Sequence, residues 1–384
     1  MLIKNGKIFT MAGENYDNGQ VLIRDGKIIE VGEKINAPEK EEVIDVHGAW
    51  VLPGIIDAHC HLGMEEEGMG FEGDDVNERV DPITPHLRAI DAINPMDEAF
   101  YSAVKGGITC VMTGPGSANV IGGQFAVIKT HGIAIDDMVV LAPAAIKIAF
   151  GENPKRVYGN KGKTPCTRMG TAGLLRQTLT EAVNYKNKKE KAEAKGEYFE
   201  TNIKMEALIP VLERKIPLKA HAHRADDILT ALRIAKEFNL KITLDHCTEG
   251  HLIADHIKRA GVPAIIGPTM TFKTKVEVKN KTFKTVKELQ DKGIKVAIMT
   301  DHPVIQQHYL PICAGLAVKE GLDIEDGLKA ITINAAEIAG VSDRVGSLEP
   351  GKDADLAIFT GNPMETLTKT LYTIIDGKIV YSYK

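Results

Sequence analysis

The stretch Val51–Gly63, VLPGIIDAHCHLG, decides the fold of this chain of 384 residues. Its apolar run leads into Asp57, His59 and His61, so a strand that begins in a hydrophobic core ends with two imidazoles. Side chains two apart on a strand share a face, so His59 and His61 point the same way and Cys60 points the opposite way. Two neutral imidazoles at one strand end supply half of a site for a first-row divalent metal. The remaining ligands must come from other parts of the chain.

Strand-like and helix-like segments alternate over residues 51–343. Apolar, β-rich runs occur at Val51–Ala58, Ile108–Thr113, Gln124–Lys129, Met138–Phe150, Pro217–Ala222, Lys241–Asp245, Val262–Ile266 and Ile294–Thr300. Helical patterns separate most of them, at Pro95–Lys105, Thr171–Lys195, Thr201–Arg214, Ala225–Phe238, Leu252–Ala260, Thr282–Asp291 and Ile312–Ala339. Continuous apolar strands between helices indicate a parallel sheet covered on both faces. About eight such units predict an α/β fold of the (β/α)8 TIM-barrel type. Most of residues 64–137 is predicted to be a long loop over the barrel mouth.

The two ends of the chain have a different pattern, with short strands and tight turns. Asn5-Gly6 and Asp25-Gly26 mark hairpins near the start, and Asp376-Gly377 marks one near the end. A few hairpins alone make a thin core, so each end needs a partner to cover it. We therefore predict a small composite β-sandwich from residues 1–50 and 344–384, with the barrel of residues 51–343 inserted between them.

Composition excludes several classes of function. With 43% apolar and 26% charged residues and a formal charge of -5, the chain has an ordinary globular composition and no basic surplus for nucleic acid or an anionic membrane. It has neither a signal-peptide pattern nor a run of about 18 apolar residues, so we expect no membrane association and a cytoplasmic location. Five scattered cysteines argue against a disulfide framework or a zinc ribbon.

Three later strand ends carry further metal-ligand side chains. The run Pro217–Ala222 ends in His221 and His223, Lys241–Asp245 ends in Asp245-His246, and the last strand ends in Asp301-His302. In a TIM barrel the carboxyl ends of all strands meet at one mouth. We therefore predict one or two divalent ions there, zinc by default for mixed imidazole and carboxylate ligands. His223 is assigned to substrate binding or to a supporting position behind the ligands. His302, on the opposite face from Asp301, is assigned to the substrate pocket or to such a supporting position.

Lys147 lies in the apolar run PAAIKIAFG, where a charged amine is unfavourable. A desolvated lysine has a lowered pKa and can take up carbon dioxide as a carbamate, whose two oxygens are able to bridge two metal ions. The alternative is that Lys147 reaches the strand end or pairs with a carboxylate.

Taken together, these residues resemble the amidohydrolase superfamily. The resemblance is carried by Leu52-Pro53-Gly54 before Asp57-Ala58-His59-Cys60-His61, then His221, His246 and Thr300-Asp301 in that order, and the tail Gly346–Leu356. The nearest branch is the imidazolonepropionase-related amidohydrolases, including peptidase-like members. The resemblance implies hydrolysis of a C–N bond by metal-activated water. It also implies one ion on His59, His61 and Asp301, a second on His221 and His246, and carbamylated Lys147 between them.

One departure from the family pattern limits this assignment. Imidazolonepropionases and many deaminases carry an acidic residue shortly after the fifth-strand His, whereas this chain reads His221-Ala222-His223-Arg224. The missing glutamate argues against both of those specific activities.

For the reaction we expect Asp301 to act as general acid and base on a small-molecule substrate, with bound water activated by the metal. Arg168, Arg224 or Tyr158 would orient a substrate carboxylate or oxyanion, although each is equally explained by a salt bridge or loop contact. The favoured function is hydrolysis of an amide, a cyclic amide or a dipeptide-like bond. A mononuclear aminohydrolase acting on a heterocycle and a catalytically silent scaffold are the alternatives. The resemblance also suggests a homo-oligomer.

Overall fold

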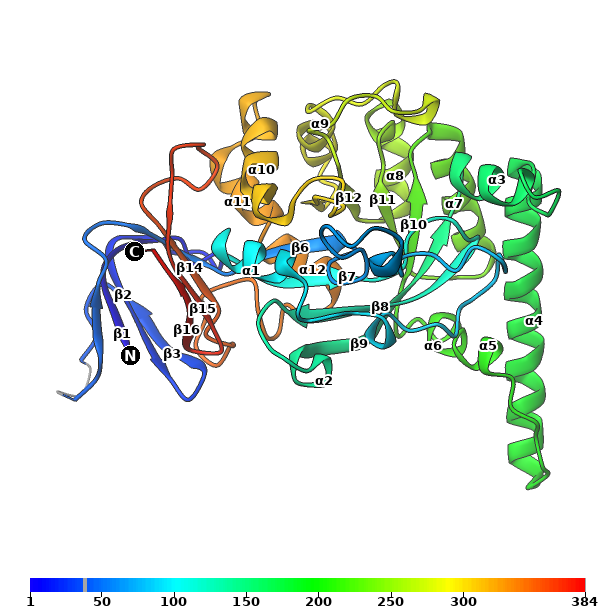
Figure 1. The fold of residues 1–384 in the computed structure, drawn as a ribbon, viewed down its shortest axis with the longest axis horizontal. Coiled ribbons are helices and arrows are strands. Elements are labelled where there is room, and N and C mark those ends of the chain that lie inside the picture. The colour runs from blue at the N-terminus through cyan, green and yellow to red at the C-terminus, as the bar shows by residue number, and fades with distance from the viewer. Residues whose placement is uncertain (37–39, 384) are drawn as a thin grey trace.

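The computed structural model describes residues 1–36 and 40–383. Two separate β-sheets organise them, one in a barrel at the centre of the molecule and the other at one end, where both chain termini lie (Figure 1). The long helix α4 (Arg168–Lys195) forms the opposite edge of the molecule. No helix within the described ranges combines the length and apolarity that crossing a membrane requires.

The barrel sheet contains eight strands in chain order. They are β6 (Ile55–Cys60), β7 (Ile108–Thr113), β8 (Ile121–Lys129), β9 (Val139–Ala149), β10 (Leu218–Ala222), β11 (Ile242–His246), β12 (Ala264–Ile266) and β13 (Val296–Ile298). Neighbouring strands are parallel except at β8, which is antiparallel to both β7 and β9. The predicted barrel is confirmed, but the expectation of a fully parallel sheet is wrong at its third strand.

Side chains help to close the barrel between its first and last strands. The buried carboxylate of Asp57 accepts hydrogen bonds from the Thr300 amide (3.0 Å), the Thr300 hydroxyl (2.6 Å) and Gln307 Nε2 (2.7 Å). Burial raises the pKa of Asp57 to about 6, and the hydrogen bonds from Thr300 and Gln307 oppose that rise. Beside it, the His61 amide donates to the His302 carbonyl at 2.9 Å. Asp57 therefore joins the strand that carries His59 to the segment that carries Asp301.

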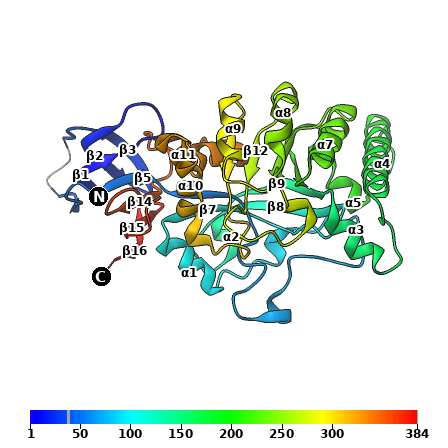
Figure 2. The same ribbon diagram turned by 90° about the horizontal axis from the view of Figure 1, so that it is seen from above.

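Helices cover the outside of the barrel, and several lie in a row along one side (Figure 2). Apart from α4 they are α1 (Glu98–Lys105), α2 (Ile135–Met138), α3 (Glu152–Gly159), α5 (Ile203–Glu206), α6 (Ile209–Leu212), α7 (Ala225–Glu237), α8 (Ala254–Ala260), α9 (Thr285–Asp291), α10 (Leu310–Lys319), α11 (Ile324–Ala330) and α12 (Ile333–Ala339). The single helical pattern predicted over Ile312–Ala339 is thus three helices. Asp323 begins α11 by accepting from the Glu325 amide, and a second break at residues 331–332 separates α11 from α12.

The second sheet combines both ends of the chain. Its order is β16 (Lys378–Ser382), β15 (Thr370–Ile375), β14 (Leu356–Phe359), β5 (Trp50–Pro53), β1 (Leu2–Ile8), β2 (Tyr16–Arg24) and β3 (Lys27–Gly32), with β4 (Val43–Asp45) also paired to β1. Antiparallel pairing of β14 with β5 joins the two ends. A module built from both termini is therefore confirmed, whereas its exact boundaries at residues 50 and 344 stay predictions.

The opening stretch Val51–Gly63 is divided between the two sheets. Residues up to Pro53 belong to β5 of the terminal sheet, and the barrel strand β6 begins at Ile55. Gly54 lies between them, and a Cβ there would be 2.0 Å from the Thr109 hydroxyl oxygen. The expectation of one continuous barrel strand over Val51–Ala58 is therefore wrong, because β5 pairs with β1 and β14 of the terminal sheet whereas β6 pairs with β7 of the barrel.

A buried lysine joins the barrel to the terminal sheet. Lys129, at the end of β8, places its ammonium 2.7 Å from Asp355, 3.1 Å from Asp353 and 3.3 Å from Asp376. Burial alone would lower the pKa of Lys129, but the facing carboxylates, above all Asp355, raise it. The lysine therefore stays charged at the interface between the two sheets.

Candidate metal centre

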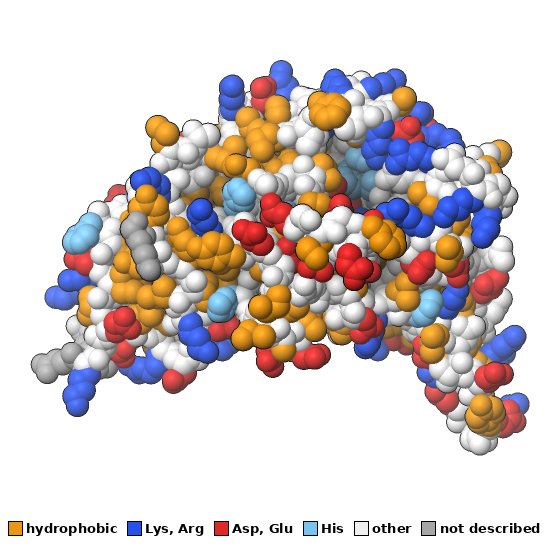
Figure 3. All heavy atoms as spheres, in the orientation of Figure 1, with side chains coloured by type: hydrophobic (Ala, Val, Ile, Leu, Met, Phe, Trp, Pro, Cys, Tyr) orange, Lys and Arg blue, Asp and Glu red, His pale blue; other side chains and the backbone are white. Residues whose placement is uncertain are grey.

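The predicted strand-end residues meet at a cavity of about 820 Å³ at the barrel mouth. Six residues from the strand ends line it: His61, Lys147, His221, His223, His246 and Asp301. A space-filling view shows histidine side chains in a hollow of the surface, next to a group of Lys and Arg side chains (Figure 3). The carboxyl ends of the strands thus bring together side chains that are far apart in the sequence.

The first cluster contains His59, His61 and Asp301. The Nε2 atoms of both histidines lie 3.4 Å from Asp301 Oδ1. His61 Nδ1 lies 2.6 Å from the Gly114 carbonyl oxygen. Because a carbonyl oxygen can only accept, Nδ1 carries the proton, and Nε2 of His61 keeps a free lone pair. Burial alone would raise the pKa of Asp301, but His246, His59 and His61 hold it well below its usual range. The carboxylate is therefore ionised and faces two imidazole nitrogens.

Lys147 lies beside this cluster and is 1% exposed. Its Nζ is 3.0 Å from His59 Nε2 and 3.9 Å from Asp245 Oδ2. Burial lowers the pKa of Lys147 to about 8, although the carboxylates of Asp245 and Asp301 oppose the shift. Burial thus favours the neutral amine, which is the form that carbamate formation requires.

Asp245 contacts the His59 ring on the side away from Asp301, and Lys219 contacts Asp245. This supporting role was not predicted from the sequence for either residue. Asp245 Oδ2 is 3.0 Å from His59 Nδ1, and its Oδ1 accepts from the Thr243 hydroxyl at 2.9 Å. The buried Lys219 ammonium is 3.4 Å from Asp245 and donates to the Ala58 carbonyl at 3.1 Å. A carboxylate behind a ring nitrogen fixes the orientation of a metal-binding histidine. An interior lysine on a strand, two residues before His221, was the available signal for Lys219.

The second cluster contains His221, His223 and His246. Their ring centroids are 4.3 to 4.8 Å apart, and all three side chains are buried. Burial, followed by neighbouring cationic groups and the other rings, lowers the pKa of each well below its usual value. Neutral imidazoles are the form that binds metals.

A divalent metal fits the residues at this mouth. Two buried groups, His59 with His246 and Asp301, and His221 with His223 and His246, each offer ligand atoms within 4.8 Å of one another. Both ring nitrogens of His221 are buried without a hydrogen-bond partner among the described residues. Burying such atoms unpaired is unfavourable, and coordination of an ion removes that cost.

Four residues predicted to bind substrate lie outside the cavity lining. Arg224 donates to Asp226 at 2.9 Å, Arg168 donates to Asp227 at 3.0 Å, and the buried Tyr158 hydroxyl donates to Asn119 at 2.5 Å. His302 is buried at the closing seam of the barrel. The two arginines are held by carboxylates at the start of α7, so the structure gives no support to their role in substrate binding. Of the five predicted residues, His223 lines the cavity.

Three other cationic side chains line the cavity, where Arg168 and Arg224 were expected. Arg156, Lys275 and Lys281 line the cavity, and Arg156 makes no ion pair with any described residue. Asn153 and Arg156, which both line the cavity, belong to helix α3. Lys275 and Lys281 come from the connection between β12 and α9, a segment without a periodic pattern that could have located them.

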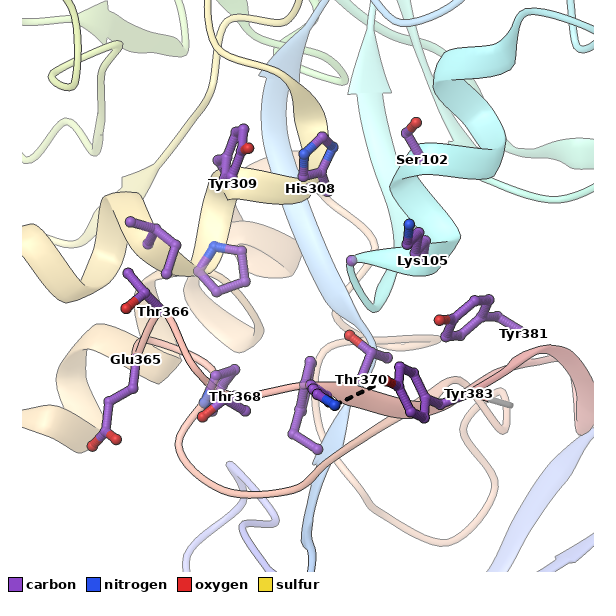
Figure 4. Close-up of a pocket in the computed structure, with 16 residues that line it drawn as sticks. Ser102, Lys105, His308, Tyr309, Glu365, Thr366, Thr368, Thr370, Tyr381 and Tyr383 are labelled. Atoms are coloured by element: carbon purple, nitrogen blue, oxygen red, sulfur yellow. Dashed lines mark hydrogen bonds between the residues drawn. The ribbon is translucent and has the colours of Figure 1, made fainter.

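A second cavity, of about 320 Å³, lies between the barrel and the terminal sheet. His308, Tyr309, Tyr381 and Tyr383 surround it, and Lys369 Nζ donates to the Tyr383 hydroxyl at 2.8 Å (Figure 4). It lies apart from the strand ends that carry the metal-binding side chains, so it does not belong to the candidate centre.

The fold is a TIM barrel with a candidate metal site at its mouth, and a family match assigns the class, a metal-dependent hydrolase of carbon–nitrogen bonds. A model of the amidohydrolase family matches residues 50–380. The chain therefore belongs to the amidohydrolase family, on its imidazolonepropionase-related branch.

Individual relatives agree with this class. The amidohydrolase tasK of Hapsidospora irregularis is 30% identical over 94% of this chain, but the match covers 39% of that longer protein. An imidazolonepropionase of Sphingopyxis alaskensis is 24% identical, with 98% of this chain and 95% of that protein covered. The crystal structure of an amidohydrolase from Thermotoga maritima superposes with a TM-score of 0.97 and 45% identity over the whole of both chains.

Proposed function

We propose that this protein hydrolyses a carbon–nitrogen bond in an amide, a cyclic amide or a dipeptide-like substrate. One observation above all supports the proposal: His59 and His61 both turn Nε2 toward Asp301 Oδ1, at a buried position beside the mouth cavity. When bound there, a divalent ion, which we propose to be zinc, supplies a water of lowered pKa and polarises a carbonyl group.

The chain's own groups have separate roles in this proposal. The ionised Asp301 accepts a proton from the attacking water and returns it to the leaving nitrogen. Lys147 places its amine next to His59, where it would act either as the free amine or, after taking up carbon dioxide, as a carbamate that binds metal. Asp245 holds the His59 ring from behind. A cytoplasmic location and a homo-oligomeric state remain predictions.

A panel of substrates with and without metal tests the function. Dialysis against a chelator is expected to abolish cleavage of the best substrate among N-acyl amino acids, cyclic amides and dipeptides, and added Zn²⁺ is expected to restore it. Amine release measures the reaction. Ammonia released from an aminated heterocycle, with no amide cleaved, would establish the aminohydrolase alternative. A protein that binds no divalent metal and cleaves nothing would instead be the silent scaffold.

Arg156 is proposed to bind a carboxylate of the substrate. Its guanidinium is free of ion pairs among the described residues and lines the same cavity as Asp301. Arg156→Ala is expected to raise KM for a carboxylate-bearing amide about tenfold, since a charge-assisted hydrogen bond contributes about 1.5–3 kcal/mol. The KM for the matching amide without a carboxylate should stay the same. Lys155→Ala, one residue earlier on α3, is the control. Equal KM changes for both amides would contradict the assignment.

A further inference from the structure

We propose that His221, His223 and His246 form a three-histidine metal site that Glu277 closes from the loop between β12 and α9. It adds His223 and Glu277 to the ligand set that the family resemblance implies. The inference rests on the proposed function for the use of a divalent ion, and it can be tested without any substrate.

The three imidazoles are oriented with free nitrogens toward one another. His246 Nδ1 donates to the Gly267 carbonyl at 2.8 Å, and His223 Nδ1 pairs with the Thr248 hydroxyl at 2.8 Å. Each contact occupies one ring nitrogen and leaves Nε2 for the common centre. His221 has both nitrogens unpartnered within the described part of the chain. One atom from each ring lies within 4.8 Å of the others. Three imidazoles and one open position are a common arrangement for zinc.

Glu277 brings a carboxylate to the open side of these rings. Its Oε1 is 3.6 Å from His223 Nε2 and 3.8 Å from His221 Nε2, and the side chain is 1% exposed. A reciprocal pair of contacts holds it there: Glu277 accepts from the Glu152 amide at 2.9 Å, and its own amide donates to the Glu152 carboxylate at 3.1 Å. The backbone of α3 therefore fixes the carboxylate in position facing the rings.

A metal explains why Glu277 and the three histidines face one another. Contacts with Lys275 or Lys147 do not explain this arrangement as well. Lys275, whose side chain is 21% exposed, lies 2.5 Å from Glu277 Oε1, and this ion pair leaves the nitrogens of His221 unpaired among the described residues. Lys147, the family-type bridging residue, contacts His59 and Asp245 instead. The three-histidine site is thus complete without modification of Lys147.

Diffraction from crystals of the full chain loaded with Co²⁺ tests the site directly. An anomalous peak about 2.0–2.2 Å from a ring nitrogen of each of His221, His223 and His246, with Glu277 as the next ligand, is the expected result. A peak bound to His221, His246 and a carbamate on Lys147, with His223 and Glu277 outside the coordination sphere, would overturn the proposal.

Metal binding by variants gives an independent measurement. His223→Gln is expected to weaken binding of one Co²⁺ equivalent at least tenfold, whereas Lys147→Met should retain the equivalent that binds at the three histidines. His256→Asn, on the exposed surface of α8, is the matched control. Loss of this equivalent in Lys147→Met and its retention in His223→Gln would refute the site. If His223→Gln does not fold, Thr248→Val, which removes the partner of His223 Nδ1, replaces it. Metal bound as expected by a protein inert toward every amide would refute the proposed function alone.

Discussion

Asp301→Asn is expected to lower kcat for the best amide substrate by about a thousandfold or more. An amide side chain cannot accept the proton of the attacking water, and general acid–base catalysis contributes about 10²–10⁴ in rate. Asp301 is buried and ionised between His59 and His61, so no neighbouring carboxylate in the first cluster can take its place at the same distance. The measurement is kcat together with the metal content and melting temperature of the variant.

The metal content separates the two proposed roles of this residue. A variant with full metal and no activity shows that Asp301 handles the proton, and one that has lost an ion shows that it acts chiefly as a ligand. Asp255→Asn removes an exposed carboxylate that pairs with Lys292, and it should leave kcat unchanged. If Asp301→Asn retained a tenth of the activity with its metal in place, another group would have to be the acid and base.

Lys129→Met is expected to destabilise the protein by about 3 kcal/mol or more, the cost of leaving a buried charge without its partner. Its ammonium is the one cation within salt-bridge distance of the buried Asp355 among the described residues. Asp353 keeps Arg344 at 2.8 Å and Lys27 at 2.6 Å, so the penalty falls mainly on Asp355. Thermal and denaturant unfolding measure the loss.

Lys27→Met is the matched control for this junction. It removes another lysine that pairs with Asp353, but its side chain is 48% exposed, so we expect a loss of about 0–1 kcal/mol. An equal loss of unfolding free energy for the two variants would show that burial of Lys129 adds no stability beyond that of an exposed ion pair.

The strand-end residues were predictable because strand geometry is local. Alternation on a strand places His59 and His61 on one face, and barrel topology brings together the ends of parallel strands, so spacing alone was enough to expect His221, His246 and Asp301 near them. The structure does bring these side chains together at one cavity.

The direction of β8 and the fate of the predicted arginines were not predictable in the same way. A run of apolar residues looks the same whether the strand is parallel or antiparallel, so Gln124–Lys129 revealed its presence but not its direction. Arg224 follows the end of β10 and Arg168 begins α4, yet carboxylates on α7 hold both side chains outside the cavity lining. Side-chain partners on another element are a tertiary property.

Glu277 is the clearest case of a residue that sequence reasoning missed. The family pattern places an acidic residue shortly after His221, where this chain has none. The carboxylate that faces His221 and His223 comes from a loop more than fifty residues later and is held by contacts with Glu152. Its position depends on how the connection between β12 and α9 packs against the start of α3, and no local pattern records that.

The Asp57 hydrogen bonds at the closing seam also bear on how this protein is made. Asp57 and Thr300 are separated by 243 positions, so at about 5–20 residues per second the ribosome needs roughly 10 to 50 s between them. Throughout that interval the nascent chain exposes His59 and His61 without Asp301. A site that holds an ion on His59, His61 and Asp301 can therefore be completed only after the last barrel strand has been synthesised.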